Sequence, residues 1–341
     1  MAPQLAPDLD WVRLAAWLER NAEGFHGLNA ARRLMGGNSN PIWRLDADSG
    51  AYVLRAQPAG ELLASAHALD REFRVLRALQ GSPAPAPRAR AFCDDLSVAG
   101  VQFYLMDFVD GRVFRNPKLE DTPRENRRAV FDAALDMLAT IHRIDVAAVG
   151  LSDFGRSGHY YERQLHRWSQ QIARALPEGD ATLEALRKAL RAAMPETDHP
   201  PTLLHGDSRF DNLMFDARGE RIVAVLDWEL STLGNPLADL GQFLAVQELP
   251  FDYLLPGLGG LDRAAHGVPT EEEQAARYFA QSGQPPADMS FYKAFAMFRQ
   301  AAMAAGLRRR ALLGTALTEE ALDFGETLCV FAELGLHLLE R

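Results

Sequence analysis

The sequence predicts an α+β protein with a small, strand-rich N-terminal part and a larger, mostly helical C-terminal part. Short apolar runs bounded by turn residues dominate the first third of the chain, as is typical of strands. Apolar residues at steps of three and four dominate the rest, as is typical of helices. The 341 residues suffice for one large or two moderate domains. We therefore expect an N-terminal lobe over 1–108 and a C-terminal lobe over 109–341.

Composition limits the class of protein. Apolar residues make up 48% of the chain and charged residues 24%, as in soluble globular proteins. The net charge of −10 argues against a nucleic-acid binder and against a polybasic membrane anchor. The first twenty residues favour an amphipathic helix over a signal peptide, and no segment reaches the length of a membrane span. We expect a cytoplasmic protein that binds neither nucleic acid nor membrane, and its oligomeric state stays open.

The N-terminal lobe shows a strand pair and a helix. Ile42–Leu45 and Tyr52–Arg55 are typical of strands joined around the turn residues Asp48 to Gly50. Apolar residues between Leu62 and Leu79 recur at helical spacing, and Gly81 and Pro83 end the pattern. A proline-rich, extended linker and an apolar strand over 101–111 follow.

The C-terminal lobe shows a series of helical patterns. The stretch 251–270 interrupts them and is too rich in glycine and proline for regular structure. The helical patterns cover 130–141, 165–176, 183–190, 288–312 and 317–340.

The candidate catalytic residues lie in and beside a polar loop between two short predicted strands. The stretch reads LLHGDSRFDNLMFDARGERIVAVLDWE. Asp207 follows the strand 202–205, and Asn212 ends the loop before the strand 213–215. Asp227 ends the strand 221–226. A hairpin turn over 216–220 would bring Asn212 and Asp227 close together.

These residue types suit phosphoryl transfer. A carboxylate and an amide oxygen are hard ligands for Mg²⁺, so Asn212 and Asp227 are the predicted metal ligands. Asp207 is then free to accept the proton of an incoming hydroxyl. Taken singly, each residue is more simply a turn former, a cap or a solvated strand end. Together, D-x-x-x-x-N followed by a hairpin and a second Asp favours the catalytic interpretation.

The same residues resemble a known family. His205-Gly206-Asp207 with Asn212 resembles the H-G-D-x-x-x-x-N loop of the aminoglycoside phosphotransferase family, and Asp227-Trp228-Glu229 resembles its metal-binding element. That family has the two-lobed protein-kinase-like fold, with a small antiparallel-sheet lobe and a mainly helical lobe. GGNSNPIWRL, LDREFRVLRAL, FYLMDFVDGR and HGDSRFDNLMF…VLDWELSTLGNPLADL are most similar to one branch. This branch comprises kinase-like domains fused to acyl-CoA dehydrogenases and their free-standing bacterial relatives.

The resemblance implies an ATP site in the N-terminal lobe. The loop over the phosphates would contain Gly37, Asn38, Ser39 and Asn40, although this run is also a plain turn. Arg55 stands where most kinases place a phosphate-binding Lys, and its planar fork can still pair with phosphate. Glu72 would be its helix partner, against the simpler interpretation of a solvated Glu. Met106 and Phe108 would meet the adenine through backbone groups, or are only strand residues.

Three further residues surround the predicted catalytic loop. The resemblance implies that Asp239 braces this loop by accepting its backbone N–H groups, although a carboxylate in a first helical turn also favours the helix dipole. We expect His205 to be structural. For Arg209 three interpretations are open: it orients Asp207, it orients an anionic acceptor, or it lies on the surface without a role in the site.

The predicted function is an ATP- and Mg²⁺-dependent kinase of a small-molecule hydroxyl. The resemblance implies a hydroxyacyl-CoA or hydroxy acid as acceptor, and an aminoglycoside or another small molecule is the alternative. A nucleotide-binding pseudokinase without turnover and a Mg²⁺-dependent hydrolase also remain open.

Overall fold

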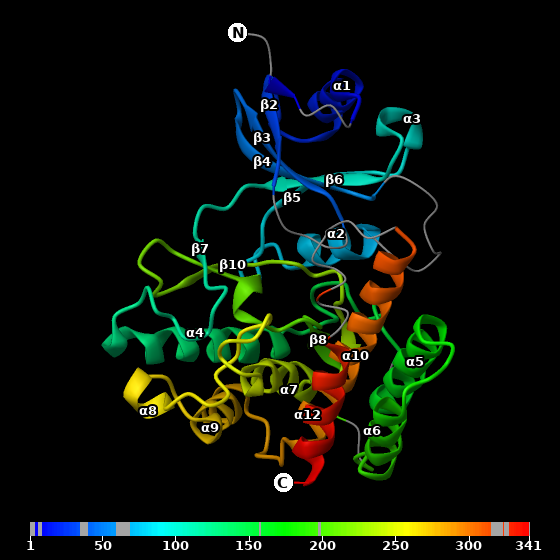
Figure 1. Ribbon diagram of the computed structural model, residues 1–341. Coiled ribbons are helices and arrows are strands. Elements are labelled where there is room, and N and C mark those ends of the chain that lie inside the picture. Colours follow the sequence, from blue (N-terminus) through cyan, green and yellow to red (C-terminus); the bar gives the residue numbers. More distant parts are fainter. Residues whose placement is uncertain are drawn as a thin grey trace. The chain divides into compact units, whose positions relative to one another are not determined.

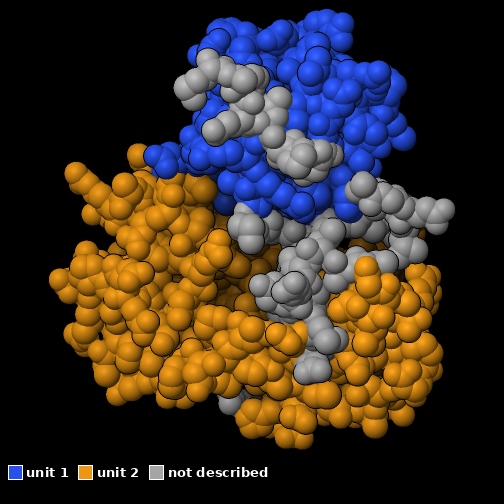
Figure 2. Space-filling model, turned by 45° about the horizontal axis from the view of Figure 1, so that its top comes forward, with its two compact units in different colours: residues 1–110, 223–229 blue, residues 111–222, 230–341 orange. Residues whose placement is uncertain are grey.

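The computed structural model describes residues 4–5, 9–34, 40–58, 69–156, 158–196, 199–314, 323 and 327–340 (Figure 1). The chain forms two compact units, coloured separately in Figure 2. The first comprises residues 1–110 together with 223–229, and the second comprises 111–222 and 230–341. The short segment 223–229, which contains Asp227, therefore belongs to the N-terminal unit although it lies far along the chain.

The first unit is built on a six-stranded sheet in the order β1-β2-β3-β4-β6-β5. The β1–β2 pair is parallel and the other four neighbouring pairs are antiparallel. The strands are β1 (Gln4–Leu5), β2 (Leu28–Arg33), β3 (Ile42–Ala47), β4 (Gly50–Ala56), β5 (Ala89–Cys93) and β6 (Phe103–Asp107). The helices are α1 (Trp11–Asn21), α2 (Leu69–Ala78) and α3 (Leu96–Ala99).

Pleating divides the sheet's side chains between two helices. Leu54 and Phe103 belong to the core cluster that includes Trp11, Leu14 and Leu18 of α1. Their neighbours in the sequence point to the opposite face, because successive side chains of a strand alternate. On that face Tyr104 meets Phe73 of α2, with ring centroids 5.9 Å apart. Arg55 is opposite Tyr104 in the β4–β6 register, so the pleat directs its side chain to the α2 face.

The second unit is mainly helical. Its long helix α10 (Ser290–Leu312) is buried on nearly all sides over residues 291–305, in contact with four other helices, α5, α6, α7 and α12. Two short antiparallel pairs, β7–β9 and β8–β11, carry the polar loop of the sequence motif. The helices are α4 (Arg124–His142), α5 (Tyr160–Ala175), α6 (Ala181–Ala192), α7 (Leu237–Ala245), α8 (Arg263–His266), α9 (Glu271–Ser282), α10 and α12 (Leu328–Glu340), with η1 (Phe210–Asn212) and η2 (Val246–Glu248); the strands are β7 (Arg112–Val113), β8 (Thr202–Leu204), β9 (Leu213–Phe215) and β11 (Thr232–Gly234). The strand β10 (Ile222–Val225) begins at the last residue of 111–222 and continues into the segment 223–229 of the first unit.

The predicted α+β class and most predicted elements are confirmed. The strand pair extends to Ile42–Ala47 and Gly50–Ala56, joined through the expected turn. Elements that were not predicted include the strands β2, β5 and β11 and the helix α9. The stretch 251–270 contains the four-residue helix α8, so the expectation of no regular structure there is wrong in this detail. Residues 59–68 and most of 315–326, where two helical patterns were expected to begin, lie outside the described residues.

Within the described residues, no helix combines the length and the apolar character needed to cross a membrane.

Candidate active site

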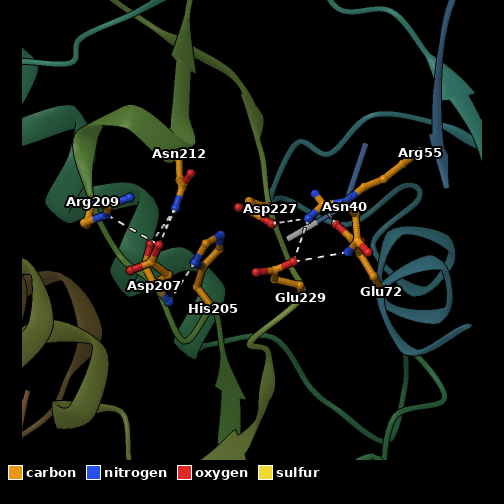
Figure 3. Close-up of polar contacts among 9 residues, drawn as sticks. All are labelled: Asn40, Arg55, Glu72, His205, Asp207, Arg209, Asn212, Asp227 and Glu229. Atoms are coloured by element: carbon orange, nitrogen blue, oxygen red, sulfur yellow. Dashed lines mark hydrogen bonds and ion pairs between the residues drawn. The ribbon is translucent and has the colours of Figure 1, made fainter. Parts of the chain in front are cut away.

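In the first unit, one buried arginine holds three carboxylates together. Arg55 donates from Nη1 to Glu72 Oε1 at 3.0 Å. Its Nη2 donates to Asp227 Oδ1 at 3.0 Å and to Glu229 Oε2 at 2.7 Å. Figure 3 shows this group, with the Asn40 side chain donating to Glu229 at 3.3 Å. The planar guanidinium of arginine has several N–H donors in fixed directions, so it can contact several carboxylates at once. A lysine ammonium is a compact point charge without this fixed geometry.

The Asp227–Glu229 segment is anchored by the residue between the two carboxylates. Trp228 is fully buried and donates from its indole Nε1 to the carbonyl of Val225 at 3.0 Å. Asp227 has a φ of 61°, in the left-handed region that Asp and Asn tolerate better than most residues. The buried tryptophan thus fixes the turn, and both flanking carboxylates reach Arg55.

Charge and burial perturb this group strongly. Burial raises the pKa of Glu72 to about 7, against the opposing effect of Arg55 and with the support of the Asp227 and Glu229 charges. A hydrogen bond with Tyr104 acts to lower this pKa but does not cancel the effect of burial. Burial acts to lower the pKa of Arg55, but Glu72 and Asp227 outweigh it and hold this pKa well above its ordinary value.

In the second unit, the loop after β8 holds Asp207 by groups on several sides. Asn212 donates from Nδ2 to the Asp207 carbonyl at 2.9 Å and to its Oδ2 at 3.1 Å (Figure 3). Arg209 Nε lies 3.4 Å from the same Oδ2, and Arg209 also pairs with Asp211 at 2.9 Å. The Asp207 N–H donates to His205 Nδ1 at 3.2 Å. The predicted structural role of His205 thus agrees with its contacts, and Arg209 contacts the predicted base directly.

Asp239 of α7 holds the backbone of this loop by hydrogen bonds. Its carboxylate accepts the backbone N–H of His205 at 2.6 Å and that of Gly206 at 2.9 Å. Burial acts to raise the pKa of Asp239, but the hydrogen bond and charge of His142 outweigh it and lower this pKa. An ionised carboxylate only accepts, so His142 donates from Nε2 at 3.3 Å and accepts the Tyr278 hydroxyl at Nδ1, 2.6 Å away.

Gly206 must be a glycine for two reasons. Its φ of 86° lies in the left-handed region. A Cβ atom at this position would stand 2.3 Å from the carbonyl oxygen of Leu230, which is backbone and has no easy way to move aside. The sharp turn that presents Asp207 therefore depends on the glycine of the H-G-D motif.

Sequence reasoning missed Arg299, which approaches the same loop from α10. Its guanidinium donates to the Gly206 carbonyl, and its Nη2 lies 4.0 Å from Asp207 Oδ1. The side chain is only 9% exposed. The sequence does contain a signal for Arg299: it is the one charged residue in the run AFAMFRQAAMAAG, in which most residues are small or apolar.

A pocket adjoins the loop within the second unit. Its polar lining includes Arg115, Arg209, Asp211 and Gln247. Its apolar lining comes from the loop, from α7 and its extension, and from the stretch after residue 250; these residues include Phe210, Phe243, Val246 and Leu255.

The structure describes only some of the remaining residues that were predicted to contact the nucleotide. Gly37, Asn38 and Ser39 lie outside the described residues, whereas Asn40 is buried and contacts Glu229. Met106 is a member of β6 and pairs with Val53 of β4. Phe108 donates its backbone N–H to the Ala51 carbonyl at 3.1 Å, so only its carbonyl is left for an adenine.

The predicted metal ligands present suitable donor atoms. The described part of the chain holds no cluster of three or more His, Cys, Asp or Glu side chains arranged for an ion. The Nδ2 of Asn212 is committed to Asp207, which directs its Oδ1 away from that residue. Arg55 contacts Oδ1 of Asp227 and leaves Oδ2. Amide and carboxylate oxygens are the ligand types that Mg²⁺ prefers, so the donor chemistry fits the ion.

The mainly antiparallel sheet that carries Arg55, the helix α2 that carries Glu72, and the helical unit with its H-G-D loop define a protein-kinase-like fold. The model of the phosphotransferase enzyme family (APH) matches residues 30–295. The chain belongs to this family.

Solved structures have the same fold. One from Ralstonia eutropha JMP134, provisionally described as an aminoglycoside phosphotransferase, is 36% identical with a TM-score of 0.86, and the match covers 97% of this chain and 98% of that one. The aminoglycoside phosphotransferase APH(4)-Ia, in complex with ADP and hygromycin B, is 14% identical with a TM-score of 0.61, covering 95% and 97% of the two chains. The second likeness concerns the fold alone.

Curated relatives are longer proteins. Acyl-CoA dehydrogenase family member 10 of Mus musculus is 38% identical over 88% of this chain and 28% of its own length. Acyl-CoA dehydrogenase family member 11 of Homo sapiens is 33% identical over 97% of this chain and 43% of its own length. The chain therefore spans less than half of these relatives.

Proposed function

We propose that this protein transfers a phosphoryl group from ATP to a hydroxyl of a small molecule, with Asp207 as the base. The observation that carries this proposal is the setting of the Asp207 carboxylate. Asn212 and Arg209 contact its Oδ2, and Asp239 accepts hydrogen bonds from the backbone of the H-G-D motif. A carboxylate fixed in this way can orient an incoming hydroxyl and accept its proton.

The group around Arg55 supports a nucleotide role for the first unit. Asp227 and Glu229 are oriented by a buried cation, and Arg55 is in turn fixed by Glu72. We propose Asn212 and Asp227 as ligands of Mg²⁺, which when bound would neutralise charge on the ATP phosphates. Gly37, Asn38, Ser39, Asn40, Met106 and Phe108 remain the proposed contacts of ATP. The complex of APH(4)-Ia with ADP supports this choice of nucleotide.

The pocket beside the loop is the proposed place of the acceptor. Its lining includes the exposed Arg115, the ion pair of Arg209 with Asp211, and largely apolar side chains. An anionic group of the acceptor could pair with Arg115, with an apolar part of the acceptor against the rest of the lining. A hydroxyacyl-CoA or hydroxy acid has that chemistry, and the acyl-CoA dehydrogenase relatives support the same class.

An aminoglycoside is the second candidate acceptor. The complex of APH(4)-Ia with hygromycin B favours it at the level of fold. Aminoglycosides are cations, so they would meet Arg115 of the pocket unfavourably. The alternative of a pseudokinase that binds nucleotide without turnover rests on Arg55 in place of lysine and on the irregular glycine loop at 36–40.

The test is an ADP-release assay with Mg²⁺-ATP over hydroxyacyl-CoAs, hydroxy acids and aminoglycosides, followed by mass spectrometry of the acceptor. We expect ADP release to depend on an anionic hydroxyl compound. Asp207→Ala should lower turnover by about 10²–10⁴-fold, the usual contribution of general-base assistance, with ATP binding retained. The matched control is Asp121→Ala, at an exposed aspartate of the same unit.

Other outcomes distinguish the alternatives. If aminoglycosides were the only compounds phosphorylated, the acceptor class would be aminoglycosides and not anionic hydroxyl compounds. Nucleotide binding with no ADP release for any compound would favour the pseudokinase. ADP release that leaves every acceptor unmodified would favour a hydrolase, and unchanged turnover in Asp207→Ala would remove Asp207 as the base.

A further inference from the structure

We propose that Arg299 of α10 is a positioning residue that holds Asp207 in its reactive orientation. It is contributed by a helix far along the chain from the H-G-D motif. The inference rests on the proposed function of Asp207. It adds a residue that acts through Asp207 and has no assigned contact with nucleotide, metal or acceptor.

The first observation is the contact with the peptide that precedes Asp207. Gly206 is held on both sides: its N–H donates to Asp239, and its carbonyl accepts from the Arg299 guanidinium. A hydrogen bond from a charged donor is stronger than one between neutral groups. Because the Gly206 carbonyl belongs to the peptide group that carries the Asp207 nitrogen, rotation of this peptide would move Asp207. Arg299 opposes that rotation directly, and Asp239 holds the preceding peptide through the Gly206 N–H.

The second observation is the distance from Arg299 to the carboxylate itself. Nη2 lies 4.0 Å from Asp207 Oδ1, beyond a normal hydrogen bond but close enough for attraction. The other oxygen, Oδ2, is contacted by Asn212 and Arg209. The positive charge of Arg299 therefore lies on the Oδ1 side, and attraction from both sides limits rotation of the carboxylate.

The third observation is the burial of Arg299. Its side chain is 9% exposed, within a helix whose surroundings are mostly apolar. Among the described residues its Nε has no hydrogen-bond partner. Burying an arginine with an unsatisfied N–H is costly, and a purely structural site would be served by an apolar residue. The cost is consistent with a residue retained for its contact with the catalytic loop.

The test compares Arg299→Met with Arg299→Lys. Methionine keeps most of the volume and removes both the donor and the charge, whereas lysine keeps one donor and one charge. We expect Arg299→Met to lower kcat about 30-fold or more while KM for ATP changes less than about twofold. Arg299→Lys should recover most of kcat. Arg309→Met, at an exposed arginine of the same helix, is the matched control.

The kinetic probe is ADP release with the acceptor found in the panel above. A second readout is hydrogen–deuterium exchange of the full-length protein. Arg299→Met should speed exchange of the amides of His205 to Asn212 and leave α12 unchanged. A kcat per folded molecule within threefold of wild type, or equal losses for Met and Lys without faster loop exchange, would overturn the proposal.

The two proposals fail separately. Wild-type protein that releases no ADP would contradict the proposed function, whereas the exchange measurement would still show whether Arg299 orders the loop. Unchanged exchange of the loop in Arg299→Met, alongside active wild-type protein, would contradict the role of Arg299 alone.

Discussion

Arg55 and Glu72 form a buried ion pair, with Nη1 3.0 Å from Oε1 and side-chain exposures of 5% and 2%. The same guanidinium contacts Asp227 and Glu229, which are more exposed. One cation therefore compensates three carboxylates. Its removal would leave a buried anion without a partner, which is far more costly than the loss of a surface pair.

The first prediction concerns replacement of this arginine. Arg55→Met should lower the free energy of unfolding by about 3–5 kcal/mol, because Glu72 would be buried without a counter-charge. Arg55→Lys should cost less, since one charge remains although the fork is lost. Urea denaturation measures both values. The exposed Arg33 of β2 supplies the control: Arg33→Met should change stability by less than about 0.5 kcal/mol.

The second prediction follows from the raised pKa of Glu72. Its value of about 7 in the folded protein exceeds the ordinary 4.5. Between these values the folded state keeps a proton that the unfolded state has released. Stability should therefore fall as pH rises from about 4.5 to 7, by about 1–3 kcal/mol in total, and change little from this source above pH 7. Urea denaturation at pH 5 to 8 without nucleotide or divalent ions measures the trend.

The matched variant for this trend is Glu72→Gln, which keeps the shape of the side chain and cannot ionise. We expect the difference in stability between wild type and this variant to change with pH in the stated direction. An identical pH dependence in the two proteins would mean that Glu72 is not the titrating group.

The third prediction concerns Asp239 beneath the catalytic loop. Asp239→Asn keeps the shape, but its amide brings N–H groups toward the backbone donors of His205 and Gly206. We expect stability to fall by about 2–4 kcal/mol, because buried donors lose a charged acceptor. Urea denaturation provides the measurement, with Asp121→Asn as the exposed control. A loss below 1 kcal/mol would show that the carboxylate does not brace the loop.

The fourth prediction tests the acceptor pocket and rests on the proposed function. Arg115 is exposed and lines the pocket with Arg209. Arg115→Ala should raise KM for an anionic acceptor about tenfold and leave KM for ATP unchanged, since one charge contact is lost. Initial-rate kinetics against Arg174→Ala, at an exposed arginine of α5, provide the comparison. Equal KM values would place the acceptor elsewhere.

Local patterns predicted much of the fold because they reflect local physics. The strands β3 and β4 were evident from apolar runs around a turn, and α4 to α6 from their helical period. The strand β2, with the sequence LNAARR, has only one large apolar residue, so its pairing partners determine it. Helix α9 was missed although its start carries a capping box between Thr270 and Glu273, a signal present in the sequence.

The sequence by itself determined which chemical groups are available: the H-G-D loop, Asn212, Asp227 and an arginine in β4. Their spacing alone could indicate phosphoryl transfer, because loop motifs are local. Only the tertiary structure decided that Arg55 contacts Asp227 and Glu229, which lie 172 and 174 positions away, and that Arg299 approaches Asp207. The physical reason is that these contacts depend on the pleat of a sheet and the burial of a helix, which residues distant in sequence create together.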